Sequence, residues 1–172
     1  MLTDVEFAAM FTGRASALRR TAYLLCGDWH RAEDLTQTAF VKCYAALSRL
    51  REPAAVDAYL RATLLHTYFD DDKRAWRRRE RATGELPDTG GTPSDPPEDR
   101  LVMLQALAAV PPRQRACLVL RYYDDLSVEE TAVALGCSGG TVKSNTARGL
   151  DALRRALGDA VPDLVLTGGD RR

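Results

Sequence analysis

The sequence lacks the groupings of cysteine and histidine that metal sites and redox centres require. It has four cysteines and two histidines among 172 residues. The cysteines, Cys26, Cys43, Cys117 and Cys137, form no C-x-x-C pair, and neither histidine has a second ligand at a reliable spacing. Isolated cysteines usually behave as small buried apolar groups. We therefore expect no metal ion, no cofactor and no structural disulfide.

Long apolar runs are missing as well, and so is an excess of one charge. No segment approaches the roughly 18 apolar residues of a membrane span. Asp4 and Glu6 stand where a signal peptide would carry cations, so we expect a cytoplasmic protein with no membrane segment. Basic and acidic residues number 24 each, and the net charge of zero does not by itself indicate a nucleic-acid partner.

Groups typical of catalysis are also absent. The sequence shows no carboxylate pair, no nucleophile triad and no phosphate-binding glycine loop. We therefore expect a binding protein and no enzymatic activity.

The charges that are present are unevenly distributed. Residues 73–81 hold six basic residues against one acid, whereas residues 82–99 carry five acids and no base. Proline, glycine, aspartate and threonine dominate the second of these segments, which has no apolar period. It is therefore expected to be a flexible linker. At about 3.3–3.6 Å per residue it could span roughly 60 Å, enough for two folded halves to bind distant sites.

Apolar residues recur at helical spacing on both sides of this linker, and no segment alternates as a strand would. The pattern predicts helices over residues 14–25, 30–50 and 54–81 in the first half. Gly27 and Pro53 mark the breaks between them. The expected fold class is all-α, with two small helical domains joined by the linker.

The second half ends in the pattern of a helix-turn-helix. Ser127 and Glu130 fit the capping box that starts a helix. Gly136 suits a left-handed helix stop, and Ser138 can cap the helix that follows. In a helix-turn-helix the second helix lies in the major groove and reads bases.

The outer face of this last helix carries side chains suited to reading bases. Val142 and Leu150 are expected to face inward, which turns Lys143 and Arg148 outward. Arginine can bridge two acceptors on guanine, and serine and lysine can bond bases or phosphates. The candidate base-reading residues are Thr141, Lys143, Ser144, Asn145, Ala147 and Arg148. Taken alone, the same face is also compatible with an ordinary solvated helix.

Two arginines that precede the helix-turn-helix are candidates for phosphate contacts. Arg113 and Arg115 lie in the segment RQRACLVLRYY, which is predicted to form a helix. Phosphate contacts position a protein on DNA without specifying the sequence.

Continuous stretches of both halves resemble the extracytoplasmic-function (ECF) RNA polymerase sigma factors. The pieces PPRQRACLVLRYYDDLS, ETAVALGCS and GTVKSNTARGLDALR resemble region 4 of that family. The stretch AEDLTQTAFVKCYAAL resembles region 2, whose usual form is close to AEDLVQETFLRAWRAL. The resemblance covers nearly the whole chain. It implies region 2 over residues 1–81, the acidic linker over 82–99, region 4 over 100–158 and a C-terminal tail over 159–172.

The resemblance implies a function in transcription initiation. ECF sigma factors bind core RNA polymerase, through the β′ clamp helices and the β subunit, and recognise the −35 and −10 elements of promoter DNA. The AEDL-x-Q helix docks on the clamp helices in that family, which assigns polymerase binding here to Asp34, Gln37 and the neighbouring Val41. An anti-sigma factor is a further candidate partner, and nothing in the sequence identifies one.

The segment DAYLRATLLHTYFDDDKRAWRRRERA corresponds to the part of region 2 that opens and holds the −10 element. Melted strands are held by basic grooves and stacked aromatic side chains, for which Tyr68, Phe69 and Trp76 are candidates. The candidate −10 residues are Arg61, His66, Asp70, Lys73, Arg74, Trp76 and Arg77.

This segment departs from the family at two places. His66 stands where asparagine is common, and Asp71 and Asp72 stand where relatives often have apolar or basic residues. Three successive carboxylates close to phosphates should weaken DNA binding unless a cation such as Arg74 or Arg77 neutralises them.

Two other functions stay open on the sequence. A stand-alone helix-turn-helix regulator would bind duplex DNA without polymerase, with its first half serving to dimerise. A degenerate sigma factor would act as an interaction protein that has lost promoter melting through residues 70–72.

Overall fold

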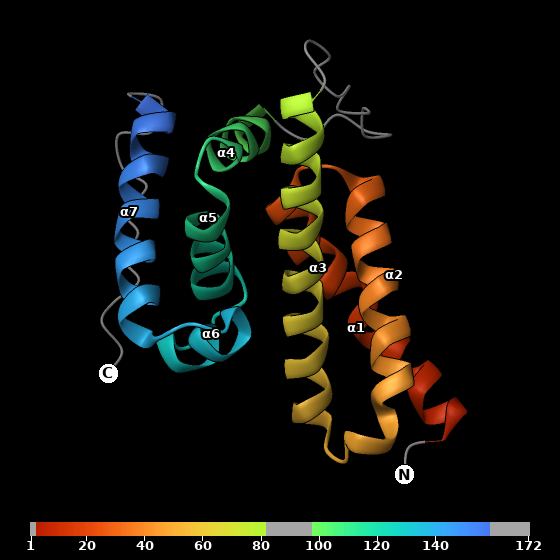
Figure 1. Cartoon of the computed structure of the whole chain (residues 1–172). Helices are drawn as coiled ribbons and strands as arrows, with labels where there is room; N and C mark the ends of the chain where they lie inside the picture. The colour runs from red at the N-terminus through yellow and green to blue at the C-terminus, as the bar shows by residue number, and fades with distance from the viewer. Residues whose placement is uncertain (1–2, 82–97, 159–172) are drawn as a thin grey trace. The chain divides into compact units, whose positions relative to one another are not determined.

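The computed structural model describes residues 3–81 and 98–158, and these residues form helices and no strands (Figure 1). The predicted all-α class is confirmed. The chain divides into two compact units. The first contains α1 (Asp4–Cys26), α2 (Trp29–Ala46), a 3₁₀ turn (Leu47–Arg49) and α3 (Pro53–Arg81). No helix in the described ranges is long and apolar enough to cross a membrane.

In the first unit, α2 packs against both α1 and α3. Leu35, Ala39 and Cys43 of α2 are buried, as their helical spacing predicted. Leu25 of α1 and Leu64 of α3 complete the centre of this core, and both are fully buried. An ion pair between Arg14 of α1 and Asp57 of α3 closes its edge, and the hydrogen bond raises the pKa of Arg14.

The start of α1 lies ten residues before the predicted one, at Asp4 rather than residue 14. A capping box explains the early start: the Glu6 N–H donates to the Thr3 hydroxyl at 3.3 Å, and the Thr3 N–H donates to the Glu6 carboxylate at 2.8 Å. Phe11 holds this end of α1 on α2, since its ring lies 4.1 Å from the Phe40 ring. The helix ends as predicted at Gly27, whose φ of 74° is left-handed.

The second unit contains four α-helices, namely α4 (Glu98–Ala108), α5 (Pro112–Leu118), α6 (Val128–Leu135) and α7 (Gly139–Leu157). A π-helical stretch, η2 (Val119–Tyr123), continues α5. The predicted boundaries of the helix-turn-helix are confirmed. Ser127 and Glu130 exchange the two hydrogen bonds of a capping box, at 2.8 and 3.0 Å, and Gly136 has a φ of 64°.

The close approach of α7 to α5 depends on Gly149. A Cβ atom added to Gly149 would lie 3.1 Å from Cγ of Leu118 and 3.2 Å from the carbonyl oxygen of Gln114. Both distances are tighter than ordinary packing contacts, and one of the atoms belongs to the backbone. The missing side chain therefore allows α7 to lie directly on α5.

A Gly149→Val substitution is expected to destabilise the second unit by about 1–3 kcal/mol, because the added carbons meet Leu118 and the Gln114 carbonyl. Hydrogen exchange of the α5 and α7 amides measures this loss within the unit. Gly140→Val is the matched control on the same helix, since its Cβ would meet only the Ser138 hydroxyl, at 3.8 Å. Equal protection in the two variants would contradict the packing role of Gly149.

Candidate functional site

The face of α2 opposite the core is exposed. Asp34, Gln37 and Val41 lie three and four residues apart and are all exposed, with Val41 at 69%. The structure therefore brings the three predicted polymerase-binding residues together on one helix face. An exposed valine flanked by polar groups suits contact with another protein, although scattered surface valines are also ordinary.

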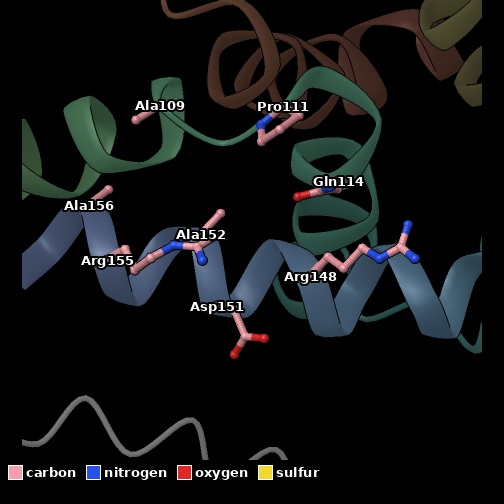
Figure 2. Close-up of a pocket in the computed structure, with 8 residues that line it drawn as sticks. All are labelled: Ala109, Pro111, Gln114, Arg148, Asp151, Ala152, Arg155 and Ala156. Carbon is pink, nitrogen blue, oxygen red and sulfur yellow. The ribbon is translucent and has the colours of Figure 1, made fainter.

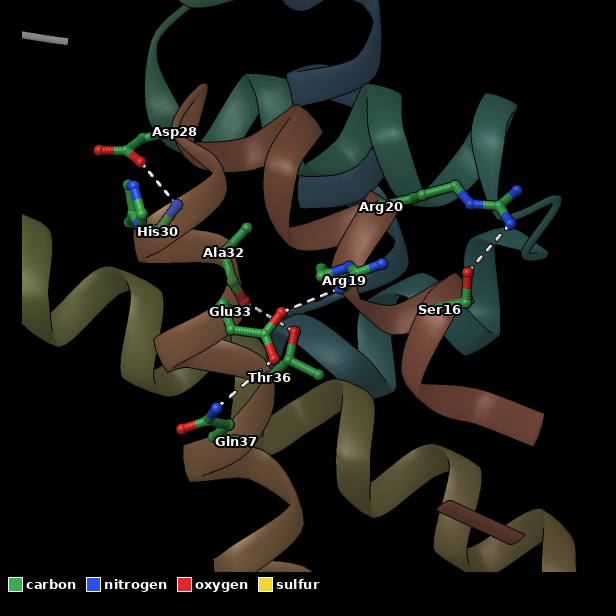
Figure 3. Close-up of polar contacts among 9 residues, drawn as sticks. All are labelled: Ser16, Arg19, Arg20, Asp28, His30, Ala32, Glu33, Thr36 and Gln37. Carbon is green, nitrogen blue, oxygen red and sulfur yellow. Dashed lines mark hydrogen bonds and ion pairs between the residues drawn. The ribbon is translucent and has the colours of Figure 1, made fainter. Parts of the chain in front are cut away.

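A polar network ties this face to α1 (Figure 3). The Gln37 amide donates to the Glu33 carboxylate at 3.4 Å, and the other carboxylate oxygen of Glu33 accepts from Arg19 of α1 at 3.1 Å. The Arg19 guanidinium also lies 5.9 Å from the Trp29 ring, which stacks on Tyr23 with centroids 3.9 Å apart. Neither Arg19 nor Glu33 was singled out from the sequence, because the contact joins two helices that no local motif relates.

A second exposed face runs along α3. His66, Asp70, Lys73, Arg74 and Arg77 are exposed and recur at intervals that place them on one side of the helix. The structure therefore groups these predicted −10 residues. Arg61 is half-buried and projects from a different side of α3, so its predicted role is not supported by this grouping.

The three candidate stacking residues of α3 differ in exposure. Tyr68 is 1% exposed and belongs to the core, so the prediction that its ring could stack on DNA is wrong. Phe69 is half-buried beside it, with ring centroids 5.3 Å apart. Trp76 is 60% exposed within the basic segment. An aromatic residue at helical spacing fits either a core or a platform, and only packing decides between them.

The successive carboxylates of Asp70, Asp71 and Asp72 point to three sides of α3, because neighbouring residues on a helix are about 100° apart. Asp70 is exposed, whereas Asp71 and Asp72 are half-buried. Asp72 forms an ion pair with Arg31 of α2, with Nη2 and Oδ1 3.9 Å apart. The expected neutralising cations were Arg74 and Arg77, and neither pairs with these carboxylates in the described part of the chain.

In the second unit, α7 presents the predicted face to solvent. Lys143, Ser144, Ala147 and Arg148 are exposed, as is Thr141, while Asn145 is half-buried. On the opposite side Val142 is fully buried and Leu153 is buried, whereas Leu150 is only half-buried. The Thr141 N–H donates to the Ser138 hydroxyl at 3.1 Å, which fixes the start of the helix as predicted.

A shallow pocket of about 650 Å³ lies beside this face, where α7 meets the α4–α5 connection (Figure 2). Its lining is small and apolar at Ala109, Ala152 and Ala156, and Figure 2 shows Arg148 and Gln114 at the other end. Arg148 forms no ion pair with any residue that the structure describes. Its side chain is exposed.

Arg115 has a structural role that the sequence did not indicate. Its Nε donates to the Leu107 carbonyl at 2.9 Å, and its Nη2 donates to the carbonyls of Ala108 and Val110 at 2.9 and 2.8 Å. Leu107 and Ala108 belong to the last turn of α4, and Val110 lies in the connection to α5. Backbone acceptors at a helix end often lack partners, although the Leu107 carbonyl also accepts from the Val110 N–H at 3.1 Å. The phosphate contact stays a prediction for Arg115 and for the exposed Arg113.

The cysteines are free in the described structure, and Cys43 and Cys117 are buried. Burial raises the pKa of the Cys117 thiol to about 11, and the nearby Cys137 adds to the shift. The thiol is therefore protonated at neutral pH and behaves as a small apolar group.

Both parts of the chain match families of known proteins. Residues 10–82 match the family model of Sigma-70 region 2, and residues 100–153 match that of Sigma-70, region 4. An RNA polymerase sigma-E factor of Streptomyces avermitilis is 38% identical over 157 residues, which cover 89% of this chain and 86% of the relative. The ECF RNA polymerase sigma factor SigC of Mycobacterium tuberculosis is 32% identical over 87% of this chain and 80% of its own length. The chain belongs to the ECF family of RNA polymerase sigma factors.

A solved structure agrees with this sigma factor in fold. The sigma factor RpoE of Bartonella quintana, crystallised with the anti-sigma factor NepR, superposes with a TM-score of 0.76 at 24% identity. The match covers 88% of this chain and 96% of the Bartonella chain. The protein is thus a sigma factor that directs promoter-specific transcription, and neither a stand-alone regulator nor a degenerate sigma factor is favoured.

An Arg115→Ala substitution is expected to destabilise the second unit by about 1–3 kcal/mol, because it removes the donor to the carbonyls of Ala108 and Val110. Hydrogen exchange across α4 and α5 reports the loss. Arg155→Ala removes the same charge from an exposed position on α7 and is expected to change little. Unchanged protection in Arg115→Ala, together with weaker DNA binding, would favour the phosphate contact instead.

Proposed function

We propose that this sigma factor docks on core RNA polymerase through Asp34, Gln37 and Val41, holds the melted −10 strand on α3 and reads the −35 element with α7. The observation that carries the proposal is the grouping of the predicted contact residues. On each of α2, α3 and α7, most of the predicted contact residues share an exposed face that lies opposite a buried one. Run-off transcription with core polymerase tests it: specific transcripts are expected, whereas tight duplex binding without polymerase dependence would favour a stand-alone regulator.

The domain limits that go with this function are proposed from the sequence pattern. Region 2 would occupy residues 1–81 and region 4 residues 100–158; the family models, which match residues 10–82 and 100–153, support these limits. The proposed linker, residues 82–99, lies outside the described residues except at its end, where α4 already begins at Glu98. The proposed tail, residues 159–172, also lies outside the described residues.

Polymerase docking on α2 would combine an apolar contact with polar ones. Val41 offers exposed apolar surface, and Asp34 and Gln37 on the preceding turns offer an acceptor and an amide. Such a narrow stripe suits a groove or a helix pair on the partner, for which the β′ clamp helices are the candidate. The β subunit is the second candidate contact. The complex of the Bartonella relative supports an anti-sigma factor as a further partner, to which no residue is assigned here.

Strand binding on α3 would depend on charge and stacking. Lys73, Arg74 and Arg77 offer cations to the backbone phosphates, and Trp76 offers a ring on which a base can stack. His66 and Asp70 lie on the same face and can select bases by hydrogen bonding. In this scheme binding energy stabilises the open strand, the polymerase performs the chemistry, and the protein acts in the cytoplasm as a non-enzymatic subunit.

An Arg148→Ala substitution is expected to cost about 1–3 kcal/mol at one position of the −35 element, because a bidentate contact to guanine would be lost. Run-off transcription from promoters that vary at each −35 position measures this effect. Arg155→Ala removes an equal charge from the same helix and serves as the control. A uniform loss across all promoters would mean that Arg148 contacts phosphate.

An Asp34→Arg substitution is expected to abolish binding to core polymerase while leaving the helices intact, since Asp34 is exposed and its carboxylate bonds no residue in the described ranges. Binding is measured by fluorescence anisotropy of the labelled sigma factor, and the fold by circular dichroism. Glu52→Arg reverses an exposed charge elsewhere in the first unit and is the control. Normal affinity in Asp34→Arg would refute the docking assignment.

A further inference from the structure

Arg31 lies between the two proposed interfaces of the first unit. It belongs to α2, one turn before Asp34, and its side chain crosses to α3. The guanidinium carbon is 5.2 Å from the centre of the buried Tyr68 ring, and Nη2 is 3.9 Å from Oδ1 of Asp72. Nη2 is buried and makes no hydrogen bond to any residue that the structure describes. The cation is thus held over an aromatic face and beside a single carboxylate.

Of the three successive aspartates, Asp72 is the one that forms the ion pair with Arg31. Asp70 and Asp71 form no ion pair with any residue in the described ranges, and helical geometry points them to other sides of α3. Asp72 directly precedes Lys73 and Arg74, the first cations of the proposed strand-binding face. An unpaired carboxylate there would lie within the roughly 10 Å over which charges act at moderate salt, and would repel DNA phosphates.

We propose that Arg31 is a positioning residue for the −10 contact: it holds Asp72 against α2 and offsets its negative charge, so that DNA phosphates meet the cations of α3 without that repulsion. This inference rests on the proposed strand-binding role of α3. It also gives the polymerase-docking helix an effect on the DNA-binding helix, because Arg31 and Asp34 share α2.

If the Arg31–Asp72 ion pair served only to stabilise the fold, its loss would lower the thermal stability. The side chains of Arg31 and Asp72 are 31% and 42% exposed, and ion pairs with that much solvent access contribute little to folding stability. Their loss is therefore expected to leave thermal unfolding nearly unchanged. The electrostatic effect on a polyanion that approaches α3 does not depend on how much the pair stabilises the fold.

The test uses the full-length sigma factor bound to core polymerase on its promoter. Open-complex formation is followed by the fluorescence of 2-aminopurine placed in the −10 element, over a range of salt concentrations. Arg31→Gln is expected to weaken open complexes about three- to tenfold and to reduce the dependence on salt, because one unit of attraction is lost. Arg31→Lys keeps the charge and is expected to stay within about twofold of the wild type.

Rescue distinguishes the ion pair from net charge. Asp72→Asn in the Arg31→Gln background is expected to restore open complexes, whereas Glu52→Gln, which changes the net charge equally at the far end of α3, is not. Equal rescue by both would overturn the proposal, as would an Arg31→Gln variant with normal open complexes. Weaker binding of Arg31→Gln to core polymerase without DNA would also overturn it, by placing Arg31 in the docking surface.

Two further variants keep the outcomes separate. Arg74→Ala tests the proposed function itself: normal open complexes in this variant would refute strand binding by α3, while a defect in Arg74→Ala with none in Arg31→Gln would refute only the inference about Arg31. Should Arg31→Gln lower the helix content, Arg31→Met replaces it, because a methionine keeps the aliphatic packing over Tyr68.

Discussion

The position of α2 between two other helices is the constraint on which the first unit depends. Because α1 and α3 both pack on α2, one face of that helix is buried, along Ala32, Leu35, Ala39 and Cys43. The opposite face is exposed and includes Asp34, Gln37 and Val41. A partner that docks there meets a helix whose position is fixed on both flanks, so little conformational freedom needs to be lost on binding.

The second unit fixes α7, the proposed reading helix, by different means. Gly149 allows α7 to lie directly on α5, and Arg115 ties the end of α4 to α5 through carbonyl hydrogen bonds. Ser138 caps the first turn of α7, the part of a recognition helix that meets the bases. The exposed side chains of α7 therefore project from a helix whose backbone position is fixed by its packing on α5.

Local patterns predicted the helices and most of their ends, because helical period and capping chemistry act within a few residues. The start of α1 was missed although its capping box, Thr3 and Glu6, is just as local. The stops at Gly27 and Gly136 and the capping box at Ser127 follow from such short-range rules. The exposed face of α7 followed from counting around one helix. The contacts that failed to be predicted join residues on different helices, as between Arg31 and Asp72, and no periodicity reports them. Tyr68 could not be assigned from the sequence either, because its helical spacing fits both a ring that stacks on DNA and a ring buried in the core; its side chain is in fact buried.

The distribution of charge around α3 bears on how such a protein avoids binding DNA indiscriminately. A helix with only cations would attract any duplex, because phosphate contacts carry no sequence information. Here Asp70 lies on the same face as Lys73 and Arg77, and the chain as a whole has no net charge. The attraction of α3 for duplex DNA is thereby reduced. If α3 holds the −10 strand as proposed, binding would depend more on stacking at the exposed Trp76, which requires an unpaired base and so favours a strand that polymerase has already begun to open.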